Sequence, residues 1–380
     1  MHKLLMVTTV PISIINFLLP FATHFRAQGW QVDAMCCGFP PSDPDYQKFD
    51  HVWDVQWSRN PLDPRNLIGT PNKIREIILR EKYDIIHVHT PVAAFVARFA
   101  LKDLRSQIGA KVIYTAHGFH FFPGGNPIKN AVFLALEKLG GNWTDYLVIM
   151  NQDDQAAVKQ HQIVPPGSCR YMPGIGLNLD YYNAQMVSDD QLTAVRSELG
   201  IEADTPLLLS VAEYTPRKRH QDTITAFAKL ARPEVHLAIA GDGPLMNKMK
   251  QLAADLGVAS RVHFLGKRSD IPVLMKAAVA NILISNQEGL PRSVMESLAL
   301  ELPTIGTKIR GTKGLLEGGC GLLIDVGDIA ALTEAMTWIL DRPEEAQAMA
   351  KRGREHLATY DLKAIIKLHE ELYTEALDRE

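Results

Sequence analysis

The amino-acid sequence predicts an α/β protein with two doubly wound parallel sheets. Short apolar runs alternate with helical stretches along the whole chain, a pattern typical of strand–helix–strand units that build parallel sheets. The length of 380 residues also exceeds what one ordinary hydrophobic core accommodates. We therefore expect two domains of the same class.

The expected strands fall into two series. In the first half of the chain, the apolar runs are Leu4–Val10, Val32–Cys36, Ile85–His89, Val112–Thr115, Tyr146–Met150 and Tyr171–Met172. In the second half, they are Leu207–Ala212, His236–Ala240, Val262–Leu265, Ile282–Ser285, Thr304–Gly306 and Leu322–Ile324.

A polar stretch, Asn178–Pro206, is expected to connect the two domains. The C-terminal segment has apolar residues on one helical face, so it must pack on a domain, and we expect it to return to the first one. Those residues are Leu362, Ile365, Ile366, Leu372 and Tyr373. The predicted domains are therefore residues 1–180 with 361–380, and residues 181–360.

Composition narrows the functional classes. The 40 basic and 43 acidic side chains leave a net charge of −3, which gives no indication of nucleic-acid binding. None of the four cysteines has zinc or redox spacing, so we expect a cytoplasmic protein. The N-terminal apolar stretch turns polar at Thr8, too early for a signal peptide or a membrane span. Any membrane contact is expected to be peripheral, at the inner face of the cytoplasmic membrane.

Glu288 and Glu296 flank one predicted strand-to-helix junction. The run Ala280–Ser285 is expected to form a buried parallel strand, and Pro291 to lie in the first turn of the following helix. Free backbone N–H groups at the helix start can bind an anion, while the two carboxylates can accept hydrogen bonds from hydroxyls. This combination suits a sugar nucleotide. The alternative is that Glu288 caps the helix and Glu296 is simply solvated.

Lys218 lies in the basic loop Arg217–His220, between a predicted strand and a predicted helix. A diphosphate leaving group gains negative charge as its bond to a sugar breaks, and a lysine at this position would stabilise that charge in the transition state. The alternative is a solvated run of charges in a surface loop.

His117 follows another predicted strand, and Gly118 beside it permits close backbone approach. It could bind a sugar hydroxyl or stabilise positive charge at the anomeric carbon; the alternative is a structural histidine bound to loop carbonyls. His87 and His89 share one face of their strand, where sheet packing explains them better than metal binding because no third ligand has suitable spacing. We predict no essential metal.

The turn Gly241–Pro244 lacks the full dinucleotide fingerprint, so a nicotinamide cofactor is not expected, and we interpret the turn as a wall near the nucleotide. In open α/β sheets, ligands bind at the carboxyl ends of the strands. If the two sheets face each other across a cleft, both sets of strand ends would point to one shared ligand and water would be excluded from it.

Taken together, these motifs resemble the family-4 retaining glycosyltransferases of the GT-B fold, over nearly the whole chain. The motifs that carry the resemblance are His87–Pro91, Tyr114–His120, Pro173–Gly176, Glu213–His220, Gly241–Pro244 and Glu288–Glu296. The first three are especially similar to the branch that builds exopolysaccharide, capsule and lipid-linked oligosaccharides. The resemblance implies two Rossmann-like domains facing across a cleft, with the C-terminal helix returning to the N-terminal domain.

The resemblance also implies a role for each matching residue. The catalytic group is His117 beside the donor sugar, Lys218 on the diphosphate and Glu288 on the outer sugar hydroxyls. The donor-binding group is Glu296 on the ribose, Gly289, Leu290 and Pro291 along the phosphates and sugar, Gly266, Lys267 and Arg268 near the uracil ring, and Gly243, Arg217 and Glu213 around the nucleotide.

Two positions depart from the family pattern. Many members have an arginine where this chain has Glu213, so part of the diphosphate charge must be met by Arg217 or by helix N-termini. Many members also have a glycine pair where this chain has Val10–Ser13, which leaves the acceptor contacts open.

The implied reaction moves a hexose, with retention, from UDP-glucose or a UDP-N-acetylhexosamine to a saccharide acceptor that can be linked to polyprenyl diphosphate. The UDP-sugar is a substrate, and no cofactor is expected. Phe121–Lys129, with the apolar residues that follow it, could form a surface for the membrane, although an ordinary packed helix is the alternative. Two other classes stay open, a UDP-sugar 2-epimerase of the same architecture and a non-catalytic UDP-sugar-binding protein.

Overall fold

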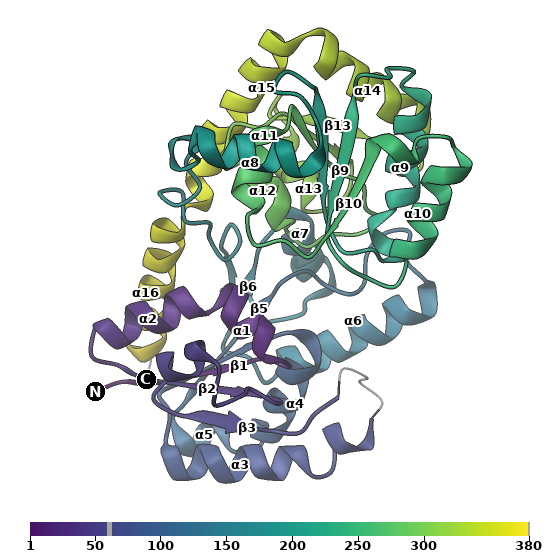
Figure 1. The fold of residues 1–380 in the computed structure, drawn as a ribbon. Coiled ribbons are helices and arrows are strands. Elements are labelled where there is room, and N and C mark those ends of the chain that lie inside the picture. The colour runs from purple at the N-terminus through teal and green to yellow at the C-terminus, as the bar shows by residue number, and fades with distance from the viewer. Residues whose placement is uncertain (59–62, 379–380) are drawn as a thin grey trace. The chain divides into compact units, whose positions relative to one another are not determined.

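The protein is described by a computed structural model that covers residues 1–58 and 63–378 (Figure 1). The chain divides into two compact units, Met1–Gly176 with Lys363–Glu380 and Leu177–Leu362. Each unit has its own parallel sheet with helices packed on it, so the predicted α/β fold with two Rossmann-like domains is confirmed.

The N-terminal unit has a seven-stranded sheet in the order β3-β2-β1-β4-β5-β6-β7. Its strands are β1 (Lys3–Val7), β2 (Gln31–Cys36), β3 (Val52–Asp54), β4 (Ile85–His89), β5 (Lys111–Ala116), β6 (Tyr146–Ile149) and β7 (Cys169–Tyr171). Its helices are α1 (Pro11–Phe17), α2 (Leu19–Ala27), α3 (Thr70–Glu81), α4 (Pro91–Leu101), α5 (Arg105–Ile108), α6 (Pro127–Gly141) and α7 (Gln152–His161), with short 3-10 helices at Pro44–Lys48 and Pro64–Asn66.

The final helix, α16 (Leu362–Asp378), packs on this unit. Its Tyr373 hydroxyl contacts His87 Nδ1 at 2.6 Å, and Arg170 pairs with Glu375 at 2.6 Å. The apolar face that the sequence indicated is therefore covered by the N-terminal unit.

The C-terminal unit has a six-stranded sheet in the order β10-β9-β8-β11-β12-β13. Its strands are β8 (Leu207–Val211), β9 (His236–Ala240), β10 (Val262–Gly266), β11 (Ala280–Leu283), β12 (Thr304–Thr307) and β13 (Leu322–Ile324). Its helices are α8 (Asp189–Leu199), α9 (His220–Lys229), α10 (Met246–Asp255), α11 (Ile271–Ala277), α12 (Arg292–Ala299), α13 (Thr312–Leu316), α14 (Ile329–Asp341) and α15 (Pro343–His356), with 3-10 helices at Ala184–Met186, Pro216–Lys218, Ala259–Arg261 and Leu357–Tyr360.

Every predicted apolar run overlaps an observed strand, because central parallel strands are buried on both faces and are continuously apolar. The first strand is shorter at its C-terminal end than the predicted run Leu4–Val10: β1 ends at Val7, and Pro11 already begins α1. The sequence reading missed β3, an edge strand of only three residues with no fully buried side chain.

A buried ion pair lies beneath α6 in the N-terminal unit. The Arg98 side chain is 1% exposed, and it donates to Glu137 at 3.3 Å and to Thr144 at 3.2 Å. The Tyr114 hydroxyl donates to the other Glu137 oxygen at 3.0 Å, and Arg98 also lies over the Tyr114 ring. Neither charge is left without a partner, so the pair can be tolerated inside the core.

Replacing Glu137 with Ala should lower the free energy of unfolding of this unit by about 3–5 kcal/mol, because the buried Arg98 charge would lose its carboxylate. Urea denaturation followed by circular dichroism measures the change. Lys138→Ala, at the neighbouring exposed position, serves as the control and should change stability by less than about 0.5 kcal/mol. Equal stability of both variants would contradict this description of the core.

Candidate active site

Glu288 lies at the centre of a charged cluster in the C-terminal unit. Its carboxylate, whose side chain is 7% exposed, accepts a hydrogen bond from Lys218 Nζ at 2.7 Å on one oxygen and from Arg217 Nη1 at 3.1 Å on the other. Glu288 therefore does not act as a helix cap, the alternative considered from the sequence. Two cations against one carboxylate leave the cluster with one excess positive charge, which suits an anionic ligand.

Burial changes the titration of Lys218. It lowers the pKa of Lys218, and the contact with Glu288 opposes that effect by favouring the charged ammonium. Lys218 is only 11% exposed, whereas Arg217 is 43% exposed. Lys218 is thus the inner cation of the cluster and Arg217 the outer one.

Two loops carry the cluster, and the sheet brings them together. The loop after β8 holds Arg217 and Lys218, the loop after β11 holds Glu288, and β8 and β11 are neighbouring strands. The backbone N–H of Asn286 donates to Arg217 O at 2.9 Å, and Arg217 Nη1 donates to Gln287 O at 2.9 Å. Both loops leave the carboxyl ends of their strands, the edge where doubly wound sheets bind ligands.

The loop after β12 packs against the turn before α12. A side chain at Gly311, where φ is +79°, would place its Cβ 2.1 Å from Gly289 O, so the two backbones can approach only through glycine. Arg310 Nε also donates to Glu288 O at 3.4 Å. Pro291 proves to be the N-cap residue, with ψ at 112°, and α12 begins one residue later than predicted.

Glu296 lies inside α12 and is 7% exposed. One of its oxygens, Oε1, accepts hydrogen bonds from the Tyr182 hydroxyl at 2.6 Å and from Arg292 Nε at 2.9 Å. Its other oxygen accepts no hydrogen bond from the residues that the structure describes. Glu296 is therefore not the solvated residue of the alternative reading, because two donors fix one oxygen and leave the other for hydroxyl groups.

The Gly241–Pro244 turn packs directly on the segment after β8. A Cβ at Gly243 would lie 2.8 Å from the backbone N of Tyr214, and that N donates to Asp242 O at 3.0 Å. The N–H of Gly241 donates to Gly266 O at 2.8 Å, which joins the ends of β9 and β10. The Gly241–Pro244 turn, which we predicted to lie near the nucleotide, is thus packed against the ends of the neighbouring strands.

The remaining predicted donor contacts differ in how they are held. Arg268 is tied to Glu198 at 2.5 Å and to Asp270 at 2.7 Å, so its side chain supports the loop, while Lys267 is exposed. Glu213 is exposed, and its backbone O accepts a hydrogen bond from His220 Nε2 at 3.1 Å. Leu290 is half-buried and packs on the core of its unit.

His117 belongs to the N-terminal unit, directly after β5. Its Nε2 contacts His89 Nδ1 at 3.2 Å, and its ring lies 5.8 Å from that of Phe17. Burial, followed by nearby His369, lowers the pKa of His117 to about 4, so its imidazole is neutral near pH 7. The alternative considered from the sequence was a histidine held by loop carbonyls, whereas in the structure His117 contacts a second histidine.

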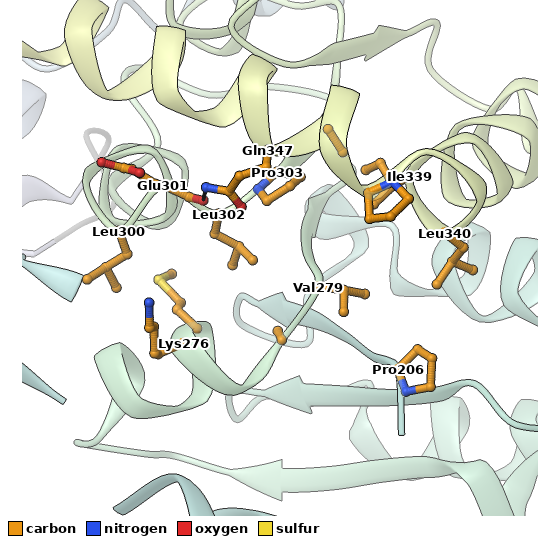
Figure 2. Close-up of a pocket in the computed structure, with 14 residues that line it drawn as sticks. Pro206, Lys276, Val279, Leu300, Glu301, Leu302, Pro303, Ile339, Leu340 and Gln347 are labelled. Carbon is orange, nitrogen blue, oxygen red and sulfur yellow. Dashed lines mark hydrogen bonds between the residues drawn. The ribbon is translucent and has the colours of Figure 1, made fainter. Parts of the chain in front are cut away.

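Figure 2 shows the residues that line a hollow in the C-terminal unit. The volume of this hollow is about 340 Å³. It lies at the amino ends of the strands, because Pro206, Val279 and Pro303 directly precede β8, β11 and β12. Its lining contains none of the predicted donor residues. The hollow is therefore not the site that Glu288 and Glu296 form at the opposite edge of the same sheet.

The comparisons with known proteins agree with this geometry. Residues 16–174 match the glycosyltransferase family 4 model, and residues 193–356 match the model of glycosyl transferases group 1. A Bacillus subtilis protein named "Putative glycosyltransferase EpsD" is 31% identical over 99% of this chain and 97% of its own length. The fold and these matches define a GT-B glycosyltransferase. The chain belongs to glycosyltransferase family 4, so the resemblance noted in the sequence is confirmed.

Two further relatives are informative. An Escherichia coli enzyme named UDP-Gal:alpha-D-GlcNAc-diphosphoundecaprenol alpha-1,3-galactosyltransferase is 26% identical over 73% of this chain and 71% of its own length. The structure of Anabaena HepE in complex with UDP and glucose superposes with a TM-score of 0.82, covers 99% of this chain and 100% of that chain, and is 19% identical.

Sequence reasoning missed Tyr182, Arg292 and Arg310. Arg292 is visible in principle, because it lies one helical turn before Glu296 on the same face. Tyr182 is 114 residues away in the sequence and only the fold brings it to Glu296. Within the described part of the chain, no group of three or more histidine, cysteine or acidic side chains is arranged to hold a metal ion, and metal independence stays a prediction.

Changing Tyr182 to Phe should weaken UDP binding about tenfold, because it removes one of the two hydrogen bonds that orient Glu296. Isothermal titration calorimetry with UDP measures the change in Kd. Tyr181→Phe, at the adjacent and 53% exposed position, should leave the Kd unchanged. Equal affinity of both variants would mean that Glu296 does not bind the nucleotide.

Proposed function

We propose that this glycosyltransferase moves a hexose from a UDP-sugar, such as UDP-glucose or a UDP-N-acetylhexosamine, to a saccharide acceptor with retention at the anomeric carbon. The observation that carries the proposal is the Lys218–Glu288–Arg217 cluster beside Glu296 at one sheet edge. It combines positive charge for a diphosphate with carboxylate oxygens for hydroxyls, the two chemistries of a sugar nucleotide. HepE, with bound UDP and glucose, supports the choice of donor.

In the proposed reaction, the bond between the anomeric carbon and the UDP oxygen breaks, and UDP leaves with the electron pair. The acceptor oxygen forms the new bond on the same face, and its proton passes to the departing phosphate. Lys218 would exchange its contact with Glu288 for one with the diphosphate, so its charge acts where negative charge develops. Arg217, beside it, would supply the charge that Glu213 cannot.

We further propose a polyprenyl-diphosphate-linked acceptor, within the synthesis of an extracellular polysaccharide. The support is twofold. The Escherichia coli relative is named for a diphosphoundecaprenol acceptor, and the motifs His87–Pro91, Tyr114–His120 and Pro173–Gly176 resemble the branch of the family that builds exopolysaccharide. Such an acceptor lies in a membrane, so the protein would need a surface that touches lipid.

The outer face of α6 is the proposed lipid contact. Ile128, Val132 and Leu139 are 76%, 47% and 45% exposed, and helical geometry places them in one stripe opposite the buried face. The same geometry places exposed Lys129 and Lys138 on either side of the stripe, where they could meet anionic headgroups. Phe121, which the sequence suggested as part of this surface, does not belong to it, because it is 8% exposed and stacks on Phe119. Among the described helices, none is both long and apolar enough to cross a bilayer.

Lys218→Ala should lower kcat by about two orders of magnitude, equivalent to about 3 kcal/mol of transition-state stabilisation. The assay follows UDP release from a panel of UDP-sugars, with and without a polyprenyl-diphosphate-linked saccharide, and determines the product anomer by NMR. Lys229→Ala, at an exposed position near the end of α9, is the control and should retain full activity. Epimer formation without acceptor, or UDP binding without turnover, would overturn the proposed reaction.

Ile128→Ser with Val132→Ser should reduce binding to anionic vesicles at least tenfold, since two exposed apolar side chains would no longer enter the lipid. Vesicle flotation measures the bound fraction. The matched control, Leu67→Ser with Ile68→Ser, changes side chains that are 49% and 72% exposed elsewhere on the same unit. If both double variants bind as the wild type does, α6 is not the lipid contact.

A further inference from the structure

His89 and His117 make a direct contact at the carboxyl edge of the N-terminal sheet. His89 is the last residue of β4, His117 follows the neighbouring strand β5, and their facing nitrogens, Nδ1 of His89 and Nε2 of His117, are 3.2 Å apart. Burial lowers the pKa of both rings, so each is neutral and carries one proton. One ring must therefore donate this hydrogen bond and the other must accept it.

The surroundings of His89 decide which ring is the donor. His89 is 3% exposed, and among the described residues its Nε2 has no hydrogen-bond partner. Nε2 lacks a partner in either tautomer: it is a buried N–H if His89 accepts at Nδ1, and a buried lone pair if His89 donates there. Orphaned buried N–H groups are the rarer of the two in proteins, which favours His89 as the donor. The adjoining cavity of about 10 Å³ is at the lower limit for one water, so solvent is a poor source of a partner for Nε2.

His87 holds the His89 ring in place. The two rings stack with centroids 4.2 Å apart, and His87 is itself fixed by the Tyr373 hydroxyl at 2.6 Å and Thr115 Oγ1 at 2.7 Å. His87 is 1% exposed and uses both of its ring nitrogens in these contacts. The His89 ring is therefore held in place with its Nδ1 directed at His117.

We propose that His89 is a positioning residue that donates its Nδ1–H to His117 Nε2 and so fixes His117 in the Nδ1–H tautomer. His117 Nδ1, which makes no hydrogen bond to the described residues, then offers an N–H to an oxygen of the donor sugar. The role in sugar binding rests on the proposed function, whereas the tautomer does not.

The tautomer can be read directly by ¹⁵N NMR of the histidine-labelled protein at neutral pH. The His117 signals are those lost in His117→Gln. We expect a protonated Nδ1 and an unprotonated Nε2 for His117 in the wild type. A protonated Nε2 would overturn the proposal, and this result needs neither activity nor a variant of His89.

Two variants of similar size then separate positioning from packing. His89→Asn keeps an N–H donor close to the place of Nδ1, whereas His89→Leu removes it. We expect the Asn variant to keep the His117 tautomer and kcat/KM for the UDP-sugar within about threefold, and the Leu variant to lose the tautomer and at least tenfold in kcat/KM. Equal kcat/KM losses in both variants, or an unchanged His117 tautomer in the Leu variant, would contradict the role of His89. If the tautomer changes as expected while no UDP-sugar is turned over by the wild type, the proposed function fails and the tautomer assignment stands.

Discussion

The pairing of one buried carboxylate with two cations is the interaction on which the proposed donor site depends. Glu288 is 7% exposed, and a carboxylate so poorly solvated is stable as an anion only with a counter-charge. Lys218 and Arg217 supply that charge from the loop after the neighbouring strand. The cluster therefore joins two loops and keeps one excess positive charge at the sheet edge, where an anionic ligand can compete for it. Glu296, oriented by Tyr182, lies one helical turn inside α12 and completes the proposed site.

The same cluster explains how the site can work without the arginine that many family members have. Glu213 stands at that position, exposed and without a side-chain hydrogen bond to the described residues. Arg217 lies next to Lys218 and shares the Glu288 carboxylate with it, so a second cation is already at the proposed diphosphate position. The candidate site residues of the N-terminal unit are neutral histidines and not charged side chains. Burial lowers the pKa of His117, which suits its proposed hydrogen bond to a sugar better than proton transfer.

The sequence predicted most of the fold because parallel strands leave a strong apolar signal. The failures are local: the edge strand β3 has only two apolar residues, Val52 and Trp53, before Asp54, and Pro291 caps α12 instead of entering it. Motifs near the strand ends predicted Glu288, Glu296, Lys218 and His117 as site residues, and these roles stay predictions. They could not identify Tyr182 or the contact between His89 and His117, because those pairs are distant in the sequence and meet only through the sheets. The apolar residues of α6 indicated the stripe in the sequence. Only the structure shows that Phe121 is buried whereas Ile128 is exposed.

A crystal structure of the protein with an intact UDP-hexose would show directly whether the diphosphate binds at Lys218 and Arg217. We expect Lys218 Nζ to lie within hydrogen-bond distance of the diphosphate, having exchanged its contact with Glu288, and Glu296 to accept hydrogen bonds from the ribose hydroxyls. A diphosphate bound away from Lys218 and Arg217, with the Lys218–Glu288 pair intact at 2.7 Å, would contradict this expectation.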